Sequence, residues 1–376
     1  MSAPDPRVAE AIAHVAAVAA EHAVDVDLHA RFPQETVEAL AATGLLGLTV
    51  PAAHGGLGAG AALACEVVTA LAEQCASSGM VLTMHLAALA VLRSTGGFDD
   101  VLRAAADGRH LSTLALSERA TRSNFWIAMG QARERDGGAD IDVEKSFVTS
   151  AGPARSYVVS TATPARTDLN AGDLFLVRVE DEGVEVLDWW RGSGLRGNAS
   201  APMRFRCSLP AAARIGRSGD AQRILLAEAI PWFHLGSASV SVGLSRGALR
   251  AVGEHLTVTR LEHLDERLVD QPVVRHSLGR LTTGVAVAEG FVRFVAAAME
   301  RGEATRRDVL QLKAVGNEAA LAATDGAMRL GGGAAYSARS PLDRMFRDAR
   351  AGVVMAPTAD MIYDMVGRDL AGLPPL

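Results

Sequence analysis

The segment "RLGGGAAYSARSPLDRMFRDARAGVVMAPTAD", residues 329–360, decides how the rest of the chain is interpreted. It opens near three consecutive glycines and continues into a densely charged turn, from Arg347 to Arg350. Nine residues without a charge follow, up to Asp360. Pro357 lies within this neutral run, at a place where a helix can begin. The segment therefore predicts a charged turn, an uncharged elbow and then a helix.

The composition is that of a folded and mostly helical protein. At 376 residues the chain is long enough for two or three structural units. Hydrophobic residues make up 49% and charged residues 21%, while the low aromatic content of 5% favours closely packed helices. The net charge is −6 and no basic block occurs, which argues against nucleic acid or an anionic membrane as partner. A local basic pocket for a phosphorylated ligand is compatible with this balance.

Cysteine and histidine usage give little sign of disulfides or of a metal. Cys65, Cys75 and Cys207 form neither a CxxC pair nor an even set, so we expect reduced thiols in a cytoplasmic protein. The N-terminus lacks the pattern of a signal peptide, and no run of about 18 uncharged apolar residues occurs. The ten histidines include no HExxH motif, so no metal site is predicted.

Three regions differ in their pattern. Residues 1–110 predict a helical domain, because apolar residues recur at spacings of three and four. Residues 111–218 contain short alternating or β-branched runs separated by Gly, Asn and Asp, which predict a β domain. Residues 219–376 return to long helical patterns and indicate an antiparallel bundle. We expect Pro231 to kink the first long helix of this bundle.

Two short motifs suggest other classes of enzyme. "GLSRG", residues 243–247, matches a hydrolase nucleophile elbow, but that elbow needs a preceding strand and a parallel sheet. "GLGAGA", residues 56–61, resembles a dinucleotide-binding loop, but no βαβ unit surrounds it. We therefore expect the first to provide close helix packing and the second to be a loop between helices.

Two segments of the β domain place hydroxyl groups beside aromatic rings. They are "ALSERATRSNFW", residues 115–126, and "KSFVTSAGPARSYVVS", residues 145–160. Thr and Ser suit strands, so ordinary sheet chemistry is one interpretation. The other is a platform for a flat heterocycle, in which Ser117 and Thr149 donate hydrogen bonds and Phe147 covers one face.

Together these segments resemble the acyl-CoA dehydrogenase family over nearly the whole chain. The resemblance is carried by ordered motifs, namely "FPQETVEALAATGLLGLTVPAAHGGLGAG" (32–60), "LALSERATRSN" (114–124), "KSFVTSAG" (145–152) and "RLGGGAAYSARSPLDRMFRDAR" (329–350). It implies a mostly helical α+β fold with an N-terminal helical domain, a central β-barrel-like domain and a C-terminal four-helix bundle. It also implies assembly as a homodimer or homotetramer.

The resemblance implies a flavin between the β domain and the C-terminal helices. The residues that it maps to flavin contacts are Ser117, Ser123, Phe147 and Thr149. The dinucleotide end is gripped partly by a neighbouring subunit in the family. The residues that it maps to this second role are Arg260, Arg329, Gly332 and Gly333.

The chain departs from the family at the dinucleotide end. Family members commonly have an arginine followed by a Phe-Gly pair where this chain reads "RLEHLDERL", residues 260–268. Arg329 replaces the glutamine before the paired glycines, and Arg122 replaces the glycine before Ser123. FAD is therefore the expected cofactor, with FMN or a freely exchanging reduced flavin as the alternatives.

The elbow lacks the residue on which the usual chemistry depends. Many dehydrogenases of the family place a catalytic glutamate six residues after the position of Arg350, and this chain has Ala356 there. Abstracting a proton next to a thioester carbonyl needs a carboxylate at hydrogen-bond range, which a methyl group cannot replace. Four other residues are candidates for an acid–base role, namely Asp360, Glu118, His85 and His234.

Three functional hypotheses follow. The first is a flavin-dependent dehydrogenase for an acyl thioester, on coenzyme A or a carrier, with Asp360 or Glu118 as a relocated base. An acid in a first helical turn, however, more often complements the helix dipole. The second is a monooxygenase on the same fold that uses reduced flavin and O2, in which His85 or His234 takes part. A buried histidine is more often structural. The third is a catalytically silent homologue that only binds an acyl group or a partner.

Overall fold

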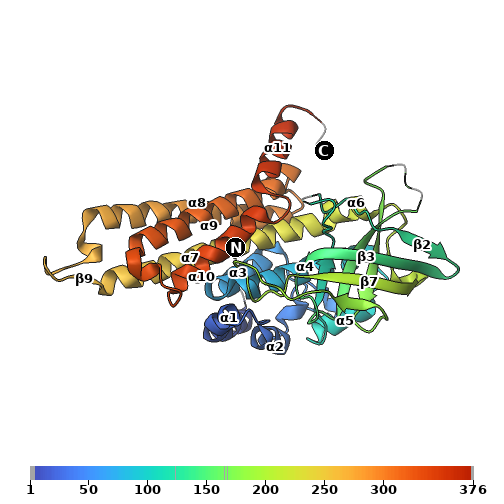
Figure 1. Cartoon of the computed structure of the whole chain (residues 1–376), viewed down its shortest axis with the longest axis horizontal. Coiled ribbons are helices and arrows are strands. Elements are labelled where there is room, and N and C mark those ends of the chain that lie inside the picture. The colour runs from blue at the N-terminus through green and yellow to red at the C-terminus, as the bar shows by residue number, and fades with distance from the viewer. Residues whose placement is uncertain (1–4, 123, 165, 167, 374–376) are drawn as a thin grey trace.

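The structure, a computed structural model, describes residues 5–122, 124–164, 166 and 168–373. Figure 1 shows an elongated molecule with the β domain at one end and a long helical bundle at the other. Helices precede and follow the β domain along the chain. The predicted mostly helical α+β fold, in the order helical, β, helical, is confirmed.

The N-terminal helices pack around α4, which is buried almost all round. Gly79 allows α4 to approach α3 and a later helix, α7 (Ile230–Val258), closely, because a Cβ there would lie 2.9 Å from the Ala72 side chain and 3.2 Å from Val240. At the start of the chain, the Asp5 carboxylate accepts a hydrogen bond from the Arg7 amide and caps α1. The helices are α1 (Pro6–Leu28), α2 (Gln34–Ala42), α3 (Ala61–Gln74), α4 (Ala76–Thr95) and α5 (Asp99–Ala106).

The β domain is an open sandwich of two four-stranded sheets, which corresponds to the barrel-like domain that was expected. Their strand orders are β1-β4-β5-β8 and β2-β3-β7-β6. Side chains that include Tyr157, Phe175 and Phe205 fill the core of this domain. The strands are β1 (Ser112–Ala115), β2 (Ala132–Arg135), β3 (Gly138–Val148), β4 (Ser156–Ala162), β5 (Gly172–Arg178), β6 (Val184–Val186), β7 (Ala201–Pro210) and β8 (Arg214–Ile215).

The C-terminal helices centre on α7, which packs against α9, α3 and α4. A π-helical turn, η4, directly precedes α7, and Pro231 lies at the start of α7. Because proline has no amide hydrogen to donate, the helix widens here, and the expected disturbance at Pro231 takes this form. The elements are α6 (Ala221–Ile224), η4 (Leu225–Ala229), α7 (Ile230–Val258), β9 (Arg260–Leu261), β10 (Glu266–Arg267), α8 (Pro272–Glu300), α9 (Arg306–Ala335), α10 (Pro341–Val354) and α11 (Ala359–Leu370).

The two motifs that suggested other enzyme classes have structural roles. Residues 243–247 lie inside α7, where Ser245 Oγ donates to the Ser241 carbonyl at 2.7 Å. A Cβ on Gly243 would lie 2.3 Å from the Thr69 carbonyl oxygen, so this glycine permits close packing of α7 on α3. Residues 56–60 form a loop before α3. Both expectations are confirmed.

The charged turn in α10 joins three parts of the fold. Arg347 donates to both carboxylate oxygens of Asp27 on α1, at 2.6 and 3.0 Å, and these contacts raise the pKa of Arg347. The buried Asp348 carboxylate accepts a hydrogen bond from the Leu195 amide of the β domain at 2.7 Å. Burial raises the pKa of Asp348 to about 6. Arg347 and Asp348 thus act as structural residues.

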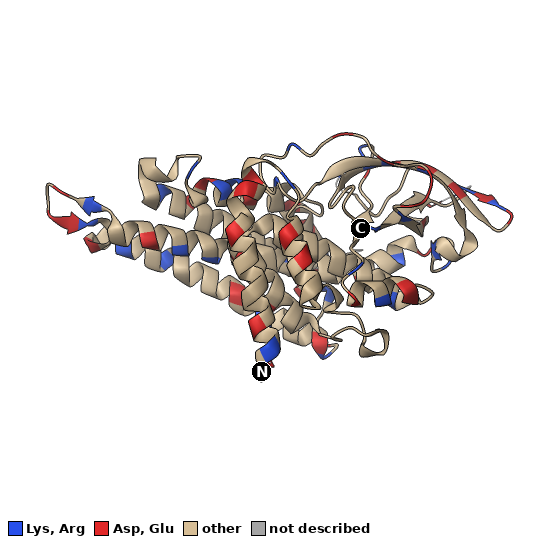
Figure 2. Cartoon of the chain, turned by 90° about the horizontal axis from the view of Figure 1, so that it is seen from below, with Lys and Arg blue, Asp and Glu red and all other residues tan. Residues whose placement is uncertain are grey.

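Two of the described helices are long and apolar enough to span a membrane by length and composition alone. One is α4, whose apolar window is 89% buried, and the other is α8, whose window is 33% buried. Core helices of soluble proteins pass the same test. Figure 2 shows acidic and basic residues interspersed over the face in view, without one large basic area.

Candidate active site

A pocket lies where the β domain meets the helices, with about 470 Å³ of space not filled by atoms, part of it open to solvent. Its lining is apolar apart from two serines. The β domain and the loop after β1 contribute Leu114, Leu116, Ser117, Phe125, Ser146 and Phe147. The helices and the elbow contribute Met84, Ala229, Ile230, Phe233 and Ala356. The neutral elbow of the opening segment is therefore one wall of the pocket.

A β-bulge at the end of β3 turns Phe147 toward this pocket. The register between β3 and β7 shifts between Lys145 and Val148, so one extra residue is accommodated there. Phe147 has a φ of 55°, which is uncommon for a residue with a side chain, and 68% of it is exposed. An exposed aromatic ring on a strained backbone at a pocket is typical of a ligand contact.

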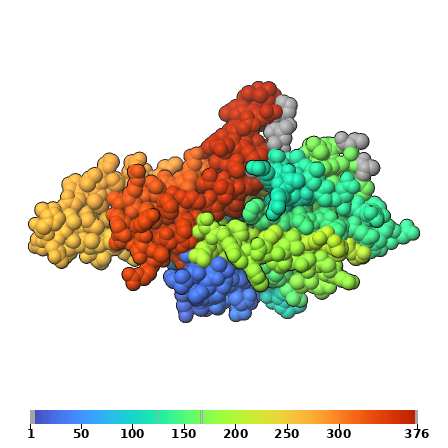
Figure 3. Space-filling view, in the orientation of Figure 1, coloured from blue at the N-terminus to red at the C-terminus, as the bar shows by residue number. Residues whose placement is uncertain are grey.

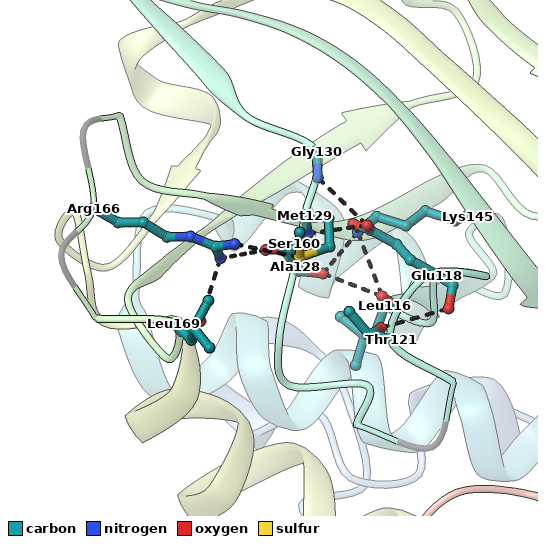
Figure 4. Close-up of polar contacts among 10 residues, drawn as sticks. All are labelled: Leu116, Glu118, Thr121, Ala128, Met129, Gly130, Lys145, Ser160, Arg166 and Leu169. Atoms are coloured by element: carbon teal, nitrogen blue, oxygen red, sulfur yellow. Dashed lines mark hydrogen bonds and ion pairs between the residues drawn. The ribbon is translucent and has the colours of Figure 1, made fainter.

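The loop after β1 is held by a buried ion pair. Lys145 Nζ donates to Glu118 Oε1 at 2.7 Å, and Glu118 Oε2 accepts from the Met129 amide at 2.9 Å (Figure 4). Burial lowers the pKa of Lys145, and the Glu118 carboxylate opposes that shift. Glu118 does not line the pocket but fixes the loop that carries Ser117 and Phe125.

Lys313 on α9 holds the elbow from behind. Its buried Nζ lies 2.9 Å from three backbone carbonyl oxygens, which belong to Gly352, Met355 and Pro357. Burial lowers the pKa of Lys313 to about 7. Three carbonyl acceptors match the three donors of a protonated ammonium. Because these carbonyls flank Ala356, the elbow is a fixed wall that presents a methyl group to the pocket.

Within the described part of the chain, no acidic, basic or histidine side chain lines this pocket. Asp360 is exposed in the first turn of α11, a helix that projects from the body in Figure 1. The Thr358 hydroxyl caps the same helix by accepting from the Met361 amide. Asp360 thus occupies the place of an acid that complements the helix dipole.

Comparison with known proteins shows to which family this chain belongs. Two family models match the chain, the "acyl-CoA dehydrogenase, N-terminal domain" over residues 8–97 and the "acyl-CoA dehydrogenase, C-terminal domain" over residues 226–371. The chain belongs to the acyl-CoA dehydrogenase family. The two matches flank the β domain and include the helices and the elbow on the far side of the pocket.

Relatives and solved structures cover most of the chain. A probable acyl-CoA dehydrogenase of Mycobacterium leprae is 28% identical over 339 residues, which is 88% of this chain and 86% of that protein. Acryloyl-CoA reductase (NADH) of Anaerotignum propionicum is 24% identical over 360 residues, 93% of this chain and 89% of that protein. The expectation of an oxidoreductase related to the acyl-CoA dehydrogenases is confirmed.

Two solved structures show how closely the fold is shared. Butyryl-CoA dehydrogenase from Megasphaera elsdenii has a TM-score of 0.92 at 18% identity, over 99% of this chain and 100% of that one. FMN-bound TdsC from a Paenibacillus species has a TM-score of 0.89 at 20% identity, over 98% of both chains. At these identities the likeness is one of fold.

His85 is a structural residue of this acyl-CoA dehydrogenase fold. Its Nε2 lies 2.9 Å from the Leu46 carbonyl oxygen, and its Nδ1 accepts a hydrogen bond from the Ser112 amide at 3.0 Å. A carbonyl can only accept, so the proton is on Nε2 and the lone pair is on Nδ1. Burial lowers the pKa of His85 to about 4. Both ring nitrogens are engaged, and His85 does not line the pocket.

Acidification is expected to destabilise the protein through His85. Its pKa is about 4 when folded against 6.5 for a free histidine, so the unfolded chain binds more protons between these values. The free energy of unfolding therefore rises with pH over this window, and His85 alone should remove about 2 kcal/mol near pH 5. Urea denaturation at about pH 5 and pH 7 measures this, and His85→Gln should lose less on acidification than the wild type. Equal losses in both proteins would contradict the assignment.

Only one of the two ring nitrogens of His234 has a hydrogen-bond partner among the described residues. Its Nδ1 lies 2.9 Å from the Val309 carbonyl oxygen, so Nδ1 carries the proton and Nε2 the lone pair. Nε2 is buried and has no hydrogen-bond partner among the described residues. Burial lowers the pKa of His234 to about 4, and the nearby Lys313 adds to this effect. The ring is therefore neutral at pH 7, and its centroid lies 5.9 Å from that of Phe233, which lines the pocket.

Only some of the residues expected to contact a flavin line the pocket. Ser117 and Phe147 meet in the pocket, where Ser146 joins them. The Thr149 hydroxyl is instead 3.0 Å from that of Ser200, and Thr149 does not line the pocket. Ser123 lies outside the described residues.

The residues expected to grip the dinucleotide of a neighbouring subunit lie away from this pocket. Arg260 is exposed on β9 and pairs with Asp265, and Figure 1 shows β9 at the far end of the bundle. Arg329 is exposed on α9 and lies 3.4 Å from Asp325. In the same helix Gly332 interrupts the backbone with a φ of 57°, and Gly333 is exposed beside it. Their role in a neighbouring subunit stays a prediction.

Sequence reasoning missed the two residues that fix the pocket walls. Lys145 and Lys313 are the only lysines in a chain with 37 Lys and Arg residues, and both are fully buried. Lysine is a compact charge with three rotatable donors, which suits convergent acceptors better than the planar arginine does. Two lysines in a chain that otherwise uses only arginine were therefore a sign, visible in the sequence, that Lys145 and Lys313 have specific roles. The described residues include no group of His, Cys, Asp or Glu that could hold a metal ion.

Proposed function

We propose that this protein is a flavin-dependent monooxygenase that oxygenates an apolar small molecule. One observation carries the proposal: Ala356 forms the pocket wall where the family's base is commonly found, and no titratable side chain joins the described lining. α-Proton abstraction needs a positioned base. Oxygen transfer from a reduced flavin needs a dry pocket and no thioester base.

The pocket has features that suit a flavin ring. Phe147 offers an exposed aromatic face, and the hydroxyls of Ser117 and Ser146 are the polar groups beside it. The Ser146 amide donates to the Ser117 carbonyl at 2.7 Å, which fixes the two serines relative to each other. A bound reduced flavin would supply two electrons to O2, with one oxygen atom entering the substrate and the other leaving as water.

The remaining lining would hold the substrate and exclude water. Met84, Phe125, Ile230 and Phe233 form an apolar enclosure. The ion pair of Glu118 with Lys145 and the contacts of Lys313 hold the two sides of this enclosure in place. Exclusion of water protects a reactive oxygen-carrying cofactor from side reactions.

A second candidate is dehydrogenation of an acyl thioester, and His234 is the observation that favours it. Its Nε2 lone pair has no partner among the described residues, and its ring lies 5.9 Å from that of Phe233 in the pocket wall. The relatives at 28% identity are named probable acyl-CoA dehydrogenases. A pKa of about 4 makes this imidazole a weak base, which counts against it.

Assembly and location form part of the same proposal. The outward face of α8 exposes Val273, Val287 and Phe294, which are 59–70% exposed, and a homodimer or homotetramer would cover such a face. Cys65, Cys75 and Cys207 are all free thiols, in keeping with a cytoplasmic location. The proposal includes either FAD or FMN as the flavin.

Anaerobic mixing with thioesters separates the two candidates. We expect a panel of short, medium and branched acyl-CoA thioesters to leave the visible absorbance of the bound oxidised flavin unchanged, because no base faces the substrate. Bleaching of the flavin by any of them would favour dehydrogenation. In that case His234→Gln should abolish the bleaching while flavin binding persists.

A further inference from the structure

The loop between β6 and β7, residues 187–200, connects the β domain to both groups of helices. Figure 3 shows a yellow-green part of the β domain in contact with the blue N-terminal helices and the red-orange C-terminal helices. In this loop the Leu195 amide donates to Asp348 on α10 at 2.7 Å. The Gly197 amide donates to Ser77 Oγ on α4 at 3.2 Å. The loop is therefore anchored on two helices outside the β domain.

Trp190 is fixed within this loop by a hydrogen bond and by close packing. Its indole nitrogen donates to the Leu195 carbonyl at 2.9 Å, and the amide of the same Leu195 is the group that Asp348 binds. A Cβ on Gly192 would lie 2.2 Å from the Trp190 ring, so the chain can pass this close to the indole only at a residue without a side chain. Both contacts lie within the chain, so the half-buried indole is held in place before a ligand binds.

The ring that Trp190 meets is that of Phe147. The two ring centroids lie 6.3 Å apart and the ring planes are at 89°, which is an edge-to-face contact. Phe147 itself lies in the bulge of β3 and is 68% exposed. A phenyl ring with so much exposed surface has few neighbours that restrict its rotamer. The contact with the fixed indole is therefore a main restraint on how the Phe147 ring is oriented.

We propose that Trp190 is a positioning residue for the flavin and that it acts through Phe147. The inference rests on the proposed function, in which a flavin ring packs on Phe147. Phe147 lines the pocket, whereas Trp190 does not line it. By restricting the Phe147 ring, Trp190 makes it offer the flavin one orientation. Such preorganisation strengthens binding, because less side-chain freedom is lost when the ligand arrives.

The same contacts connect the two sides of the pocket. Asp348 lies on α10, the helix that leads into the elbow with Ala356. From Asp348 the contacts run to Leu195, then to Trp190, and from Trp190 to Phe147 in the β domain. One loop anchored on α10 thus sets the orientation of the Phe147 ring relative to the wall that contains Ala356.

A double-mutant cycle on flavin affinity tests the inference. The full-length protein, freed of flavin, is titrated with FAD and separately with FMN while flavin fluorescence is followed. Trp190→Leu should raise the Kd of the flavin that the wild type binds by about three- to tenfold, the usual worth of one aromatic pair. In the Phe147→Leu background the same change should raise the Kd by less than about 1.5-fold, because no phenyl ring is left to position.

Two further variants complete the cycle. Trp189→Leu alters the neighbouring indole, which is 80% exposed, and should bind flavin as the wild type does. Trp190→Phe keeps an aromatic ring, so its affinity should lie closer to that of the wild type than the affinity of Trp190→Leu does. Trp190→Phe also replaces Trp190→Leu in the cycle if the latter does not fold, which circular dichroism establishes for each variant.

The outcomes are distinct. If the change at Trp190 weakens flavin binding equally in the wild-type and Phe147→Leu backgrounds, Trp190 does not act through Phe147 and the inference is overturned. An unchanged Kd in a folded Trp190→Leu protein also overturns it, because the indole is then purely structural. Both results leave flavin binding by the wild type intact. Failure of the wild type to bind either flavin overturns both the inference and the proposed function.

Discussion

Lys145→Met is expected to lower the free energy of unfolding by about 3–5 kcal/mol, which is the usual cost of breaking a buried ion pair. The Lys145 side chain is fully buried and that of Glu118 is 8% exposed. Lys145 Nζ also donates to Ser160 Oγ at 3.0 Å. Methionine keeps the apolar stem but leaves the Glu118 carboxylate with backbone amides as its remaining donors. Urea denaturation monitored by circular dichroism measures the loss.

A double variant separates the ion pair from simple packing. Glu118→Gln combined with Lys145→Met removes both charges, so it should be more stable than Lys145→Met alone. The loop that carries Ser117 and Phe125 should also loosen in the single variant, and its flavin affinity should fall. A loss below about 1 kcal/mol in Lys145→Met would show that the pair does not hold this loop.

Ala356→Glu is expected to install thioester dehydrogenation. The residue lines the pocket, and Lys313 fixes the elbow on both sides of it. A carboxylate in this apolar site should have a raised pKa, which suits a general base near neutral pH. We expect anaerobic reduction of bound flavin by at least one acyl-CoA thioester to become about 100-fold faster or more than in the wild type. Stopped-flow absorbance measures the rate.

The matched control is Ala356→Gln, which adds the same volume without a base. It should bind flavin and thioester as Ala356→Glu does but give no acceleration. If Ala356→Glu retains flavin and no thioester reduces it faster, the missing carboxylate is not what separates this pocket from a dehydrogenase site.

The fold was predictable because its signals are periodic or local. Apolar spacing marked the helices on both sides of the β domain, and β-branched runs marked the strands between them. The motif from the paired glycines to Arg350 placed the elbow, and Arg347 indeed ties α10 to Asp27. The sequence predicted a kink at Pro231 rather than the π-helical turn that precedes it. A proline shows that an amide donor is missing from the helix, but it does not show how the helix backbone adjusts.

The site was predictable in part. Phe147 and Ser117 were expected to meet a heterocycle, and both line the pocket. Ser146 was missed because its position depends on the bulge in β3, which arises from pairing with β7 far along the chain. The sequence could not tell whether Glu118 faced the pocket or a buried partner, since the answer depends on Lys145, 27 residues away.

The helical half of the pocket required tertiary structure. Met84 comes from α4, whereas Ile230 and Phe233 come from α7, and in the sequence each has the pattern of ordinary helix core. The same holds for a second hollow, whose lining includes Arg191 and Arg196 from one loop and Arg347 from α10. Side chains that converge from distant segments leave no local pattern.

The reaction of the reduced, flavin-loaded protein with O2 tests the central claim most directly. After rapid mixing, a monooxygenase pocket should give reoxidation in two resolved phases, with a long-lived species whose absorbance differs from both oxidised and reduced flavin. A single phase that yields oxidised flavin and one equivalent of free hydrogen peroxide would contradict the proposal.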